Sequence, residues 1–102
     1  MNPTKVGLIG LGTVGSGVAK ILLEDQDLIG LKLGRPLVLA KIADLDLETP
    51  RPVSVDRGLL TRDASEIIND PKIEIIVELI GGYEPAKTFI LQAIKAGKHI
   101  VT

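Results

Sequence analysis

The sequence predicts an α/β protein whose parallel sheet is doubly wound, with helices on both faces, and truncated after about five strands. Short apolar runs rich in Ile, Leu and Val alternate with amphipathic stretches of helical period, which is typical of parallel α/β sheets. The first apolar run, residues 6–9, leads directly into a glycine-rich segment and then into a predicted helix. We expect residues 1–102 to form one domain, because this length suits a single hydrophobic core.

The composition narrows the class of protein. One Phe, one Tyr and no Trp leave an aliphatic core, and the absence of Cys removes disulfides and thiolate sites. A formal net charge of −1 argues against a nucleic-acid partner, because phosphates require an excess of cations. No apolar run approaches the roughly 20 residues of a membrane span, and too few residues precede the first strand for a signal peptide. We therefore expect a cytoplasmic soluble domain.

The elements of the first half follow from the hydrophobic pattern. A helix is predicted over residues 13–25, and residues 25–36 are predicted to be a connector. Residues 37–43 form a second apolar run and are predicted to be a strand. Residues 44–57 show no helical stripe, so we expect a mostly irregular loop there, followed by a short strand at residues 58–61. The predicted buried stripe of the first helix consists of Val14, Val18, Ile21 and Leu22.

The second half begins with a helix-start signal. Asp63 and Glu66 have capping-box spacing, and the short helix they open is expected to end before Pro71. The remaining predicted elements are a strand at residues 73–80, a helix from Pro85 to Gly97 and a fifth strand from His99 to Thr102. Because the chain stops in or just after this strand, we expect it to be a fragment of a longer polypeptide.

The glycine-rich segment has the spacing of a dinucleotide-binding turn. Gly10 would permit the tight turn, Gly12 would let a pyrophosphate approach the backbone, and Gly15 would let the helix pack close to the strand. The helix N-terminus would present N–H groups to the phosphates. The segment thus predicts a Rossmann-like cofactor site, and the alternative is a strand–helix turn with glycine for packing only. Gly17 is interpreted as a helix-packing residue.

An acidic residue is expected at the end of the second strand, where it would accept hydrogen bonds from the adenosine ribose. Asp44 is the first candidate, and Asp46 is the competitor two residues further on. The alternative is that both are solvated loop acids.

Further candidates lie at the end of the strong strand at residues 73–80. Glu78 would be a costly buried charge without donors, so we favour a structural role for it, bonding the loop backbone, over cofactor or substrate contact. Gly81 and Gly82 either form a plain turn or let a nicotinamide ribose approach. His99 lies at the opposite end of the sheet and is interpreted as structural. No grouping of His, Asp and Glu has metal-ligand spacing.

With these features in place, the sequence resembles the N-terminal region of homoserine dehydrogenases. The matching stretches keep the family's order and are spread over nearly the whole chain; they are residues 6–17, 33–36, 50–53, 77–82 and 96–102. The resemblance implies an NAD(P)-dependent oxidoreductase that interconverts L-homoserine and L-aspartate 4-semialdehyde, in the biosynthesis of threonine and methionine.

The resemblance also implies roles for particular residues. Thr13 and Val14 would lie in the cofactor loop, and Gly81, Gly82 and Thr102 along the nicotinamide side. The family's catalytic residues lie in a separate domain beyond the position that matches Thr102, so no catalytic residue is expected here and the fragment alone is expected to be inactive. The full-length enzyme would bind the substrate and form a homo-oligomer through another region, so the fragment is expected to be monomeric.

One departure from the family concerns cofactor choice. Many members carry an Arg just after the second strand, and the aligned residue here is Leu45. This favours NAD over NADP, although Lys41 or Arg51 could substitute. The alternative functions are the coenzyme domain of another amino-acid or semialdehyde dehydrogenase and a non-catalytic NAD(H) sensor. A methyltransferase-like domain is disfavoured, because the three-glycine turn is a pyrophosphate-binding feature.

Overall fold

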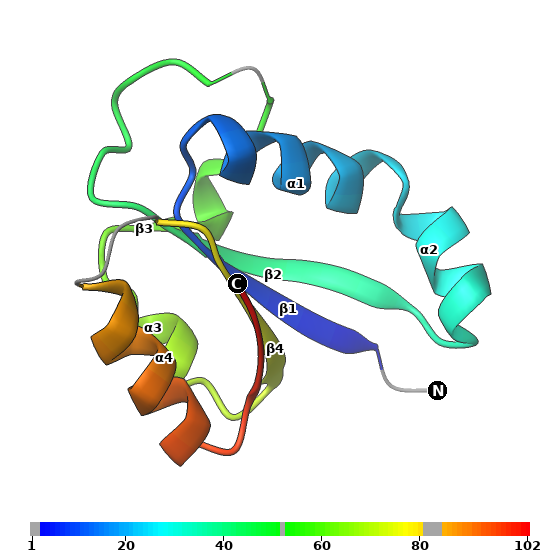
Figure 1. The fold of residues 1–102 in the computed structure, drawn as a ribbon. Helices are drawn as coiled ribbons and strands as arrows, with labels where there is room; N and C mark the ends of the chain where they lie inside the picture. Colours follow the sequence, from blue (N-terminus) through cyan, green and yellow to red (C-terminus); the bar gives the residue numbers. More distant parts are fainter. Residues whose placement is uncertain (1–2, 52, 81–84) are drawn as a thin grey trace.

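The computed structural model describes residues 3–51, 53–80 and 85–102. Within these residues the chain forms a five-stranded, fully parallel sheet in the order β3-β2-β1-β4-β5 (Figure 1). The strands are β1 (Thr4–Ile9), β2 (Leu37–Ala43), β3 (Leu60–Thr61), β4 (Ile73–Glu78) and β5 (His99–Val101). The order reverses direction between β1 and β4, which is the switch point of a doubly wound Rossmann-like fold. The predicted fold class is therefore confirmed.

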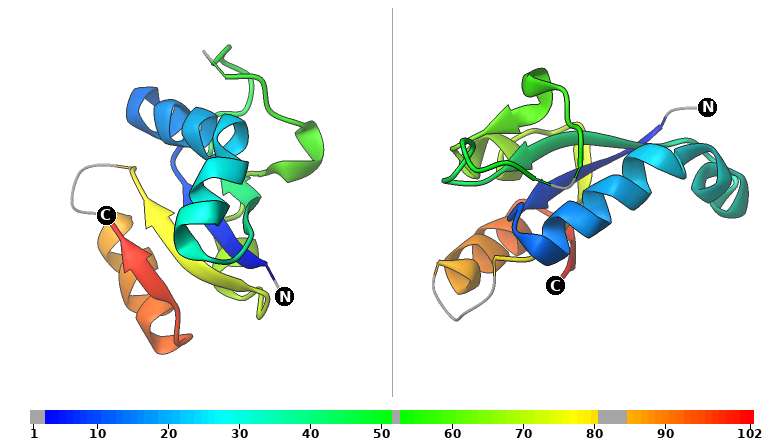
Figure 2. Two further views of the ribbon diagram at one scale, coloured as in Figure 1. Left: turned by 90° about the vertical axis from the view of Figure 1, so that its right-hand side faces the viewer. Right: turned by 90° about the horizontal axis from the view of Figure 1, so that it is seen from above.

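Helices cover both faces of this sheet. They are α1 (Thr13–Glu24), α2 (Gln26–Leu33), α3 (Ser65–Ile68) and α4 (Ala86–Lys95), with a 3₁₀ turn, η1 (Arg57–Leu59), before β3. The views in Figures 1 and 2 place α1 and α2 on one face and α3 and α4 on the other. No helix in the described part of the chain is long and apolar enough to cross a membrane.

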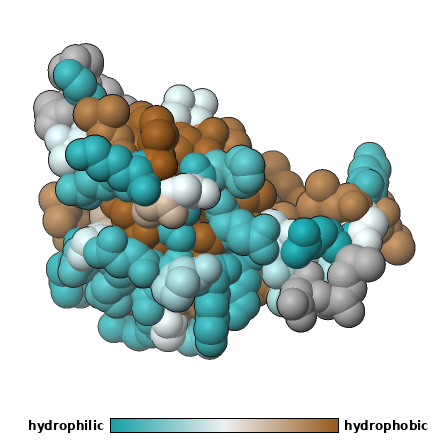
Figure 3. Space-filling view, turned by 90° about the horizontal axis from the view of Figure 1, so that it is seen from below, coloured by the Kyte–Doolittle hydropathy of each residue, from teal (hydrophilic) through white to brown (hydrophobic). Residues whose placement is uncertain are grey.

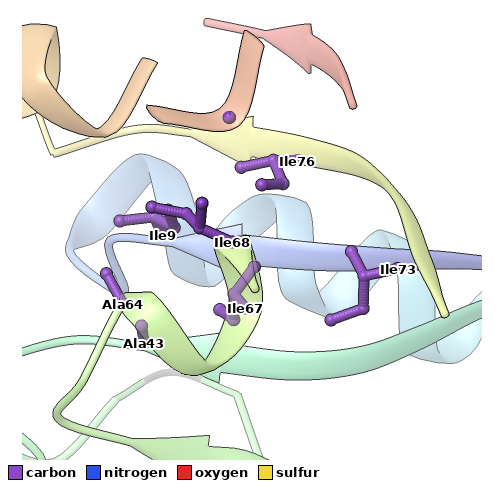
Figure 4. Close-up of a cluster of buried hydrophobic side chains, with 8 residues drawn as sticks. Ile9, Ala43, Ala64, Ile67, Ile68, Ile73 and Ile76 are labelled. Atoms are coloured by element: carbon purple, nitrogen blue, oxygen red, sulfur yellow. The ribbon is translucent and has the colours of Figure 1, made fainter. Parts of the chain in front are cut away.

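The core consists of one aliphatic cluster on each face. Successive residues of a strand point to opposite faces, so Leu8 of β1 packs toward α1 while Ile9 packs toward α3 and α4. The cluster beneath α3 and α4 is drawn in Figure 4 and contains Ile9, Ala43, Ala64, Ile67, Ile68, Ile73, Ile76 and Ala93. Burial on both faces explains why the central strands read as continuous apolar runs.

The predicted buried stripe of α1 is wrong for two of its four residues, while Leu22 packs against the core and Val18 is half-buried. Val14 and Ile21 are 65% and 54% exposed, whereas Gly15, Ser16 and Ala19 are buried. Small residues on the buried face let this helix lie close to the sheet, so the larger side chains are displaced to its flanks. The packing interpretation of Gly17 is also wrong, because an added Cβ there would meet nothing within 4 Å.

The predicted connector at residues 25–36 contains a helix. α2 ends at Leu33, and Gly34 forms the C-cap in a left-handed conformation (φ 77°). None of its residues is buried, and Leu31 is 80% exposed. The helix therefore has no buried stripe from which the sequence pattern could predict it. Apolar residues also reach the surface among hydrophilic ones on the face shown in Figure 3.

The predicted capping box is wrong in its pairing. The Asp63 carboxylate accepts from the backbone N–H of Ser65 at 2.9 Å, and α3 begins at Ser65. The Glu66 carboxylate instead accepts from the Thr61 hydroxyl and pairs with Lys41 at 3.5 Å. Glu66 therefore joins α3 to β2 and β3 rather than capping its own helix.

Three strand boundaries differ by two residues. The first strand begins at Thr4 rather than at Val6. Gly58 and Leu59 belong to η1, so β3 begins at Leu60, and β4 ends at Glu78 rather than at Ile80. As predicted, α3 ends before Pro71. Gly97 lies just beyond α4 with φ 79°, as expected of a helix stop.

Candidate functional site

The turn between β1 and α1 is shaped by two sterically required glycines. Gly10 has φ 103°, and a Cβ on it would lie 2.9 Å from the backbone nitrogen of Ile80. A Cβ on Gly15 would lie only 2.0 Å from the carbonyl oxygen of Gly10. These clashes confirm the expected steric roles, a tight turn at Gly10 and close packing of α1 at Gly15.

Gly12 differs from both. It is exposed, its φ of −75° is open to any residue, and a Cβ on it would meet nothing within 4 Å. It is the N-cap of α1, and no side chain caps this end. The space beside Gly12 is therefore open to a ligand that approaches the helix N-terminus.

The N-terminus of α1 presents backbone donors at this open space. The N–H groups of the first helical turn have no intrahelical acceptor, and the helix dipole places partial positive charge there. Thr13 and Val14 are exposed, while the buried Ser16 hydroxyl donates to the Leu11 carbonyl at 3.2 Å and so supports the turn from beneath. The geometry suits an anionic group.

Asp44 follows β2 directly and contacts this turn. Its Oδ2 accepts from the Leu11 N–H at 2.6 Å, and its Oδ1 accepts from the Asp46 N–H at 2.8 Å. The guanidinium of Arg51 lies 3.8 Å from Oδ1. The side chain of Asp44 is 20% exposed, so a partly buried carboxylate lies at the edge of the glycine turn.

Asp46, the competing acid, turns toward its own loop. Its carboxylate accepts from the hydroxyl and the N–H of Thr49 and from the N–H of Glu48. The Thr49 hydroxyl bond, followed by the two backbone bonds, lowers the pKa of Asp46 to about 2. Because β2 ends at Ala43, Asp46 lies in the loop beyond the strand.

A cavity of about 190 Å³ adjoins Asp44. It lies at the carboxyl ends of β1 and β2 and reaches α4, and most of its wall is apolar. Its lining consists of Ile9, Gly10, Ala43, Asp44, Leu45, Arg62, Ala64, Ile80, Pro85 and Phe89. Sequence reasoning missed this cavity, because segments far apart in the sequence form it together.

Glu78 and Thr102 lie at or near the same edge of the sheet. Glu78 is 7% exposed, and its Oε2 accepts from the Ile80 N–H at 2.7 Å, which supports the structural interpretation. Thr102 directly follows β5, whose Val101 pairs with Val77. Gly81 and Gly82 lie outside the described residues.

A larger hollow lies at the opposite edge. It has a volume of about 560 Å³ and runs between α2 and the start of β2, past Gly30, Arg35 and Leu37. It is open to solvent and remote from the glycine turn and from Asp44. We therefore place the candidate site at the smaller cavity, which Gly10 and Asp44 line, and at the adjoining turn that leads to the N-terminus of α1.

Comparisons with known proteins agree on one family. A family model described as the NAD-binding domain of homoserine dehydrogenase matches residues 10–102. The homoserine dehydrogenase of Methylobacillus glycogenes is 46% identical over 102 residues, which are all of this chain and 25% of that protein. That of Bacillus subtilis is 40% identical over 102 residues, again all of this chain and 24% of that protein.

Solved structures give the same result. Homoserine dehydrogenase of S. aureus at pH 7.5 superposes with a TM-score of 0.88 at 39% identity, covering 97% of this chain and 26% of that one. The enzyme from Thiobacillus denitrificans gives 0.86 at 40% identity, covering 97% and 23%. The chain thus spans about a quarter of the length of the relatives it matches.

Proposed function

This chain belongs to the family of homoserine dehydrogenase NAD-binding domains, and on that basis we propose that it holds the nicotinamide dinucleotide of an enzyme interconverting L-homoserine and L-aspartate 4-semialdehyde. Residues 1–102 would be the cofactor domain of a longer oxidoreductase of threonine and methionine biosynthesis. The observation that carries the proposal is the open glycine turn at Gly12, with the Asp44 carboxylate accepting a hydrogen bond from Leu11, the preceding residue of the turn.

The pyrophosphate would bind over Gly12. Its negative charge suits the unpaired N–H groups and the positive dipole end at the start of α1, including those of Thr13 and Val14. Gly12 leaves the space that the phosphates require, while Gly10 and Gly15 hold the turn close to the sheet. The residues present therefore fit the group.

The adenosine half would bind at Asp44 and in the adjoining cavity. Each carboxylate oxygen has two lone pairs, so Asp44 can accept from ribose hydroxyls while it keeps its bonds to Leu11 and Asp46. The apolar side chains of Leu45, Ile80 and Phe89 line a space suited to a flat base. Asp46 is the weaker candidate, because its carboxylate already has three donors in its own loop.

The nicotinamide half would extend toward the carboxyl ends of β4 and β5, where Gly81, Gly82 and Thr102 are the proposed contacts. The bound dinucleotide supplies the hydride chemistry. The role of this chain is to bind and orient it, and no residue of the chain is assigned as general acid or base. Purified 102-residue chain is accordingly expected to show no NADH production from homoserine; activity lost on mutating a residue outside the cofactor site would contradict this.

We further propose that NAD is preferred to NADP. Leu45 is 81% exposed and offers no charge, and the Asp44 carboxylate would repel a 2′-phosphate. The two possible substitutes already have carboxylate partners, since Lys41 pairs with Glu66 and Arg51 pairs with Asp44. Calorimetric titration of the chain with NADH, NADPH and S-adenosylmethionine tests the function. Binding of S-adenosylmethionine without NADH binding would contradict it.

A further inference from the structure

The parallel pairing of β2 and β3 brings Arg62 beside the proposed ribose acid. Ala43 and Thr61 are register partners, and the Asp44 N–H donates to the Thr61 carbonyl at 3.0 Å. Asp44 and Arg62 are therefore the first residues after two adjacent strands, at the same edge of the sheet. Separated by 18 positions in sequence, they become neighbours only in the fold.

Arg62 also lines the cavity that Asp44 and Leu45 line. If Asp44 accepts from the adenosine ribose, the 2′ position of that ribose lies near Asp44, at the mouth of this cavity. A phosphate on the 2′ oxygen would then extend past Asp44 toward the neighbouring strand end. Of the described residues that line the cavity, Arg62 is the one with a cationic side chain.

Among the residues that the structure describes, the Arg62 guanidinium is held by one exposed partner, Glu48. Its Nη2 lies 3.0 Å from Oε1 of Glu48, and the two side chains are 57% and 78% exposed. Exposed ion pairs of this kind contribute little to stability, so a more highly charged anion can displace Glu48. A phosphate monoester offers such an anion and can accept two parallel bonds from a guanidinium.

Arg51 is held more firmly. Its side chain is 16% exposed, it donates to the carbonyl oxygens of Asp46 and Thr49, and it lies 3.8 Å from Asp44. Moving it to a phosphate would break these bonds and leave Asp44 without its cationic neighbour. By the same movement Arg62 would give up its bond to Glu48, the partner that the described part of the chain provides.

We propose that Arg62 is the residue that binds the 2′-phosphate when NADP occupies the site, and that Glu48 competes with that phosphate for the guanidinium. This inference rests on the proposed cofactor site. Arg62, the first residue after β3, would provide the positive charge that Leu45, in the loop after β2, lacks. The pair Arg62–Glu48 then sets how much NADP the domain accepts beside NAD.

The test compares NADH and NADPH dissociation constants by calorimetry, at one fixed salt concentration, for the parent chain and three variants. Arg62→Gln is expected to weaken NADPH binding about five- to tenfold and to change NADH binding by less than about twofold. Arg62→Lys, the matched control, keeps the charge and should retain part of the NADPH affinity. Glu48→Gln should strengthen NADPH binding about two- to fivefold, because it removes the competing carboxylate.

The outcomes separate the inference from the function on which it rests. A parent chain that binds no NADH contradicts the proposed function itself. NADH binding with an unchanged NADPH-to-NADH ratio in Arg62→Gln, equal weakening of both cofactors, or no NADPH binding by the parent overturns the role of Arg62. An unchanged NADPH affinity in Glu48→Gln overturns the competition by Glu48.

Discussion

The backbone N–H of Leu11 donates a 2.6 Å hydrogen bond to Oδ2 of Asp44, across 33 positions of sequence. Ile9 and Ala43 are partners in the parallel pairing of β1 and β2, so the residues that follow them emerge side by side. The carboxylate proposed to bind ribose therefore also fixes the backbone of the turn proposed to bind pyrophosphate. One hydrogen bond thus joins the proposed ribose site to the proposed pyrophosphate site.

Asp44→Ala is expected to lower the free energy of unfolding by about 1–3 kcal/mol, because it leaves the Leu11 N–H without its acceptor. Asp44→Asn keeps an acceptor oxygen and should lose less. Urea denaturation of both variants measures the difference. Equal stability of parent and Asp44→Ala would show that this bond does not hold the turn.

Gly15→Ala is expected to destabilise the chain by at least about 1 kcal/mol, because its Cβ would lie 2.0 Å from the Gly10 carbonyl oxygen. Gly17→Ala is the matched control on the same helix. It has open space for the methyl group and should stabilise the helix by about 0.5–1 kcal/mol. Thermal and urea unfolding of the pair should therefore change in opposite directions; similar shifts would contradict the close contact at Gly15.

Glu78 is expected to support the backbone that follows β4. Glu78→Leu removes the acceptor of the Ile80 N–H and should cost about 1–3 kcal/mol in unfolding free energy, whereas Glu78→Gln keeps an acceptor. The backbone of Leu79 and Ile80 lies against Gly10. Glu78→Leu should therefore also weaken NADH binding more than Glu78→Gln does. A Leu variant that matches the parent in both measurements would refute the structural role.

The loop acid Asp46 makes stability depend on pH. Its pKa is lowered from 3.8 to about 2 in the folded chain, so its contribution is present above about pH 4 and is lost as pH falls toward 2. The stability difference between parent and Asp46→Asn should therefore shrink between about pH 6 and pH 3. Thr49→Val removes the donor with the largest effect and should raise the Asp46 pKa toward 3.8 in an NMR titration. An unchanged pKa in that variant would contradict the assigned cause.

The sequence predicted the elements whose burial leaves a strong pattern. The second strand was expected at residues 37–43 and lies at Leu37–Ala43, because apolar residues dominate a strand covered on both faces. α2 could not be predicted in this way, since none of its residues is buried. The buried face of α1 was predicted incorrectly, because the helix packs close to the sheet through the small residues Gly15 and Ala19 rather than through its largest apolar side chains.

Within the site, the glycine turn and Asp44 could be predicted from the sequence, because each lies next to a strand with a strong apolar pattern. The cavity and the position of Arg62 could not be predicted from the sequence. Their place depends on the register of β2 and β3, and β3 has only two residues and a weak sequence signal. The contact between Leu11 and Asp44 was likewise invisible, since it depends on the pairing of β1 with β2.

The central claim is that the open space at Gly12 receives the pyrophosphate, and calorimetric titration of NADH into Gly12→Val tests it most directly. The branched side chain meets no protein atom near its Cβ, so the fold should persist, with an unfolding transition close to that of the parent. NADH affinity should fall at least about tenfold, because the side chain occupies the phosphate's path. Gly17→Ala, on the same helix but outside the turn, should bind NADH as the parent does. A folded Gly12→Val chain that binds NADH with the parent's affinity would contradict the account.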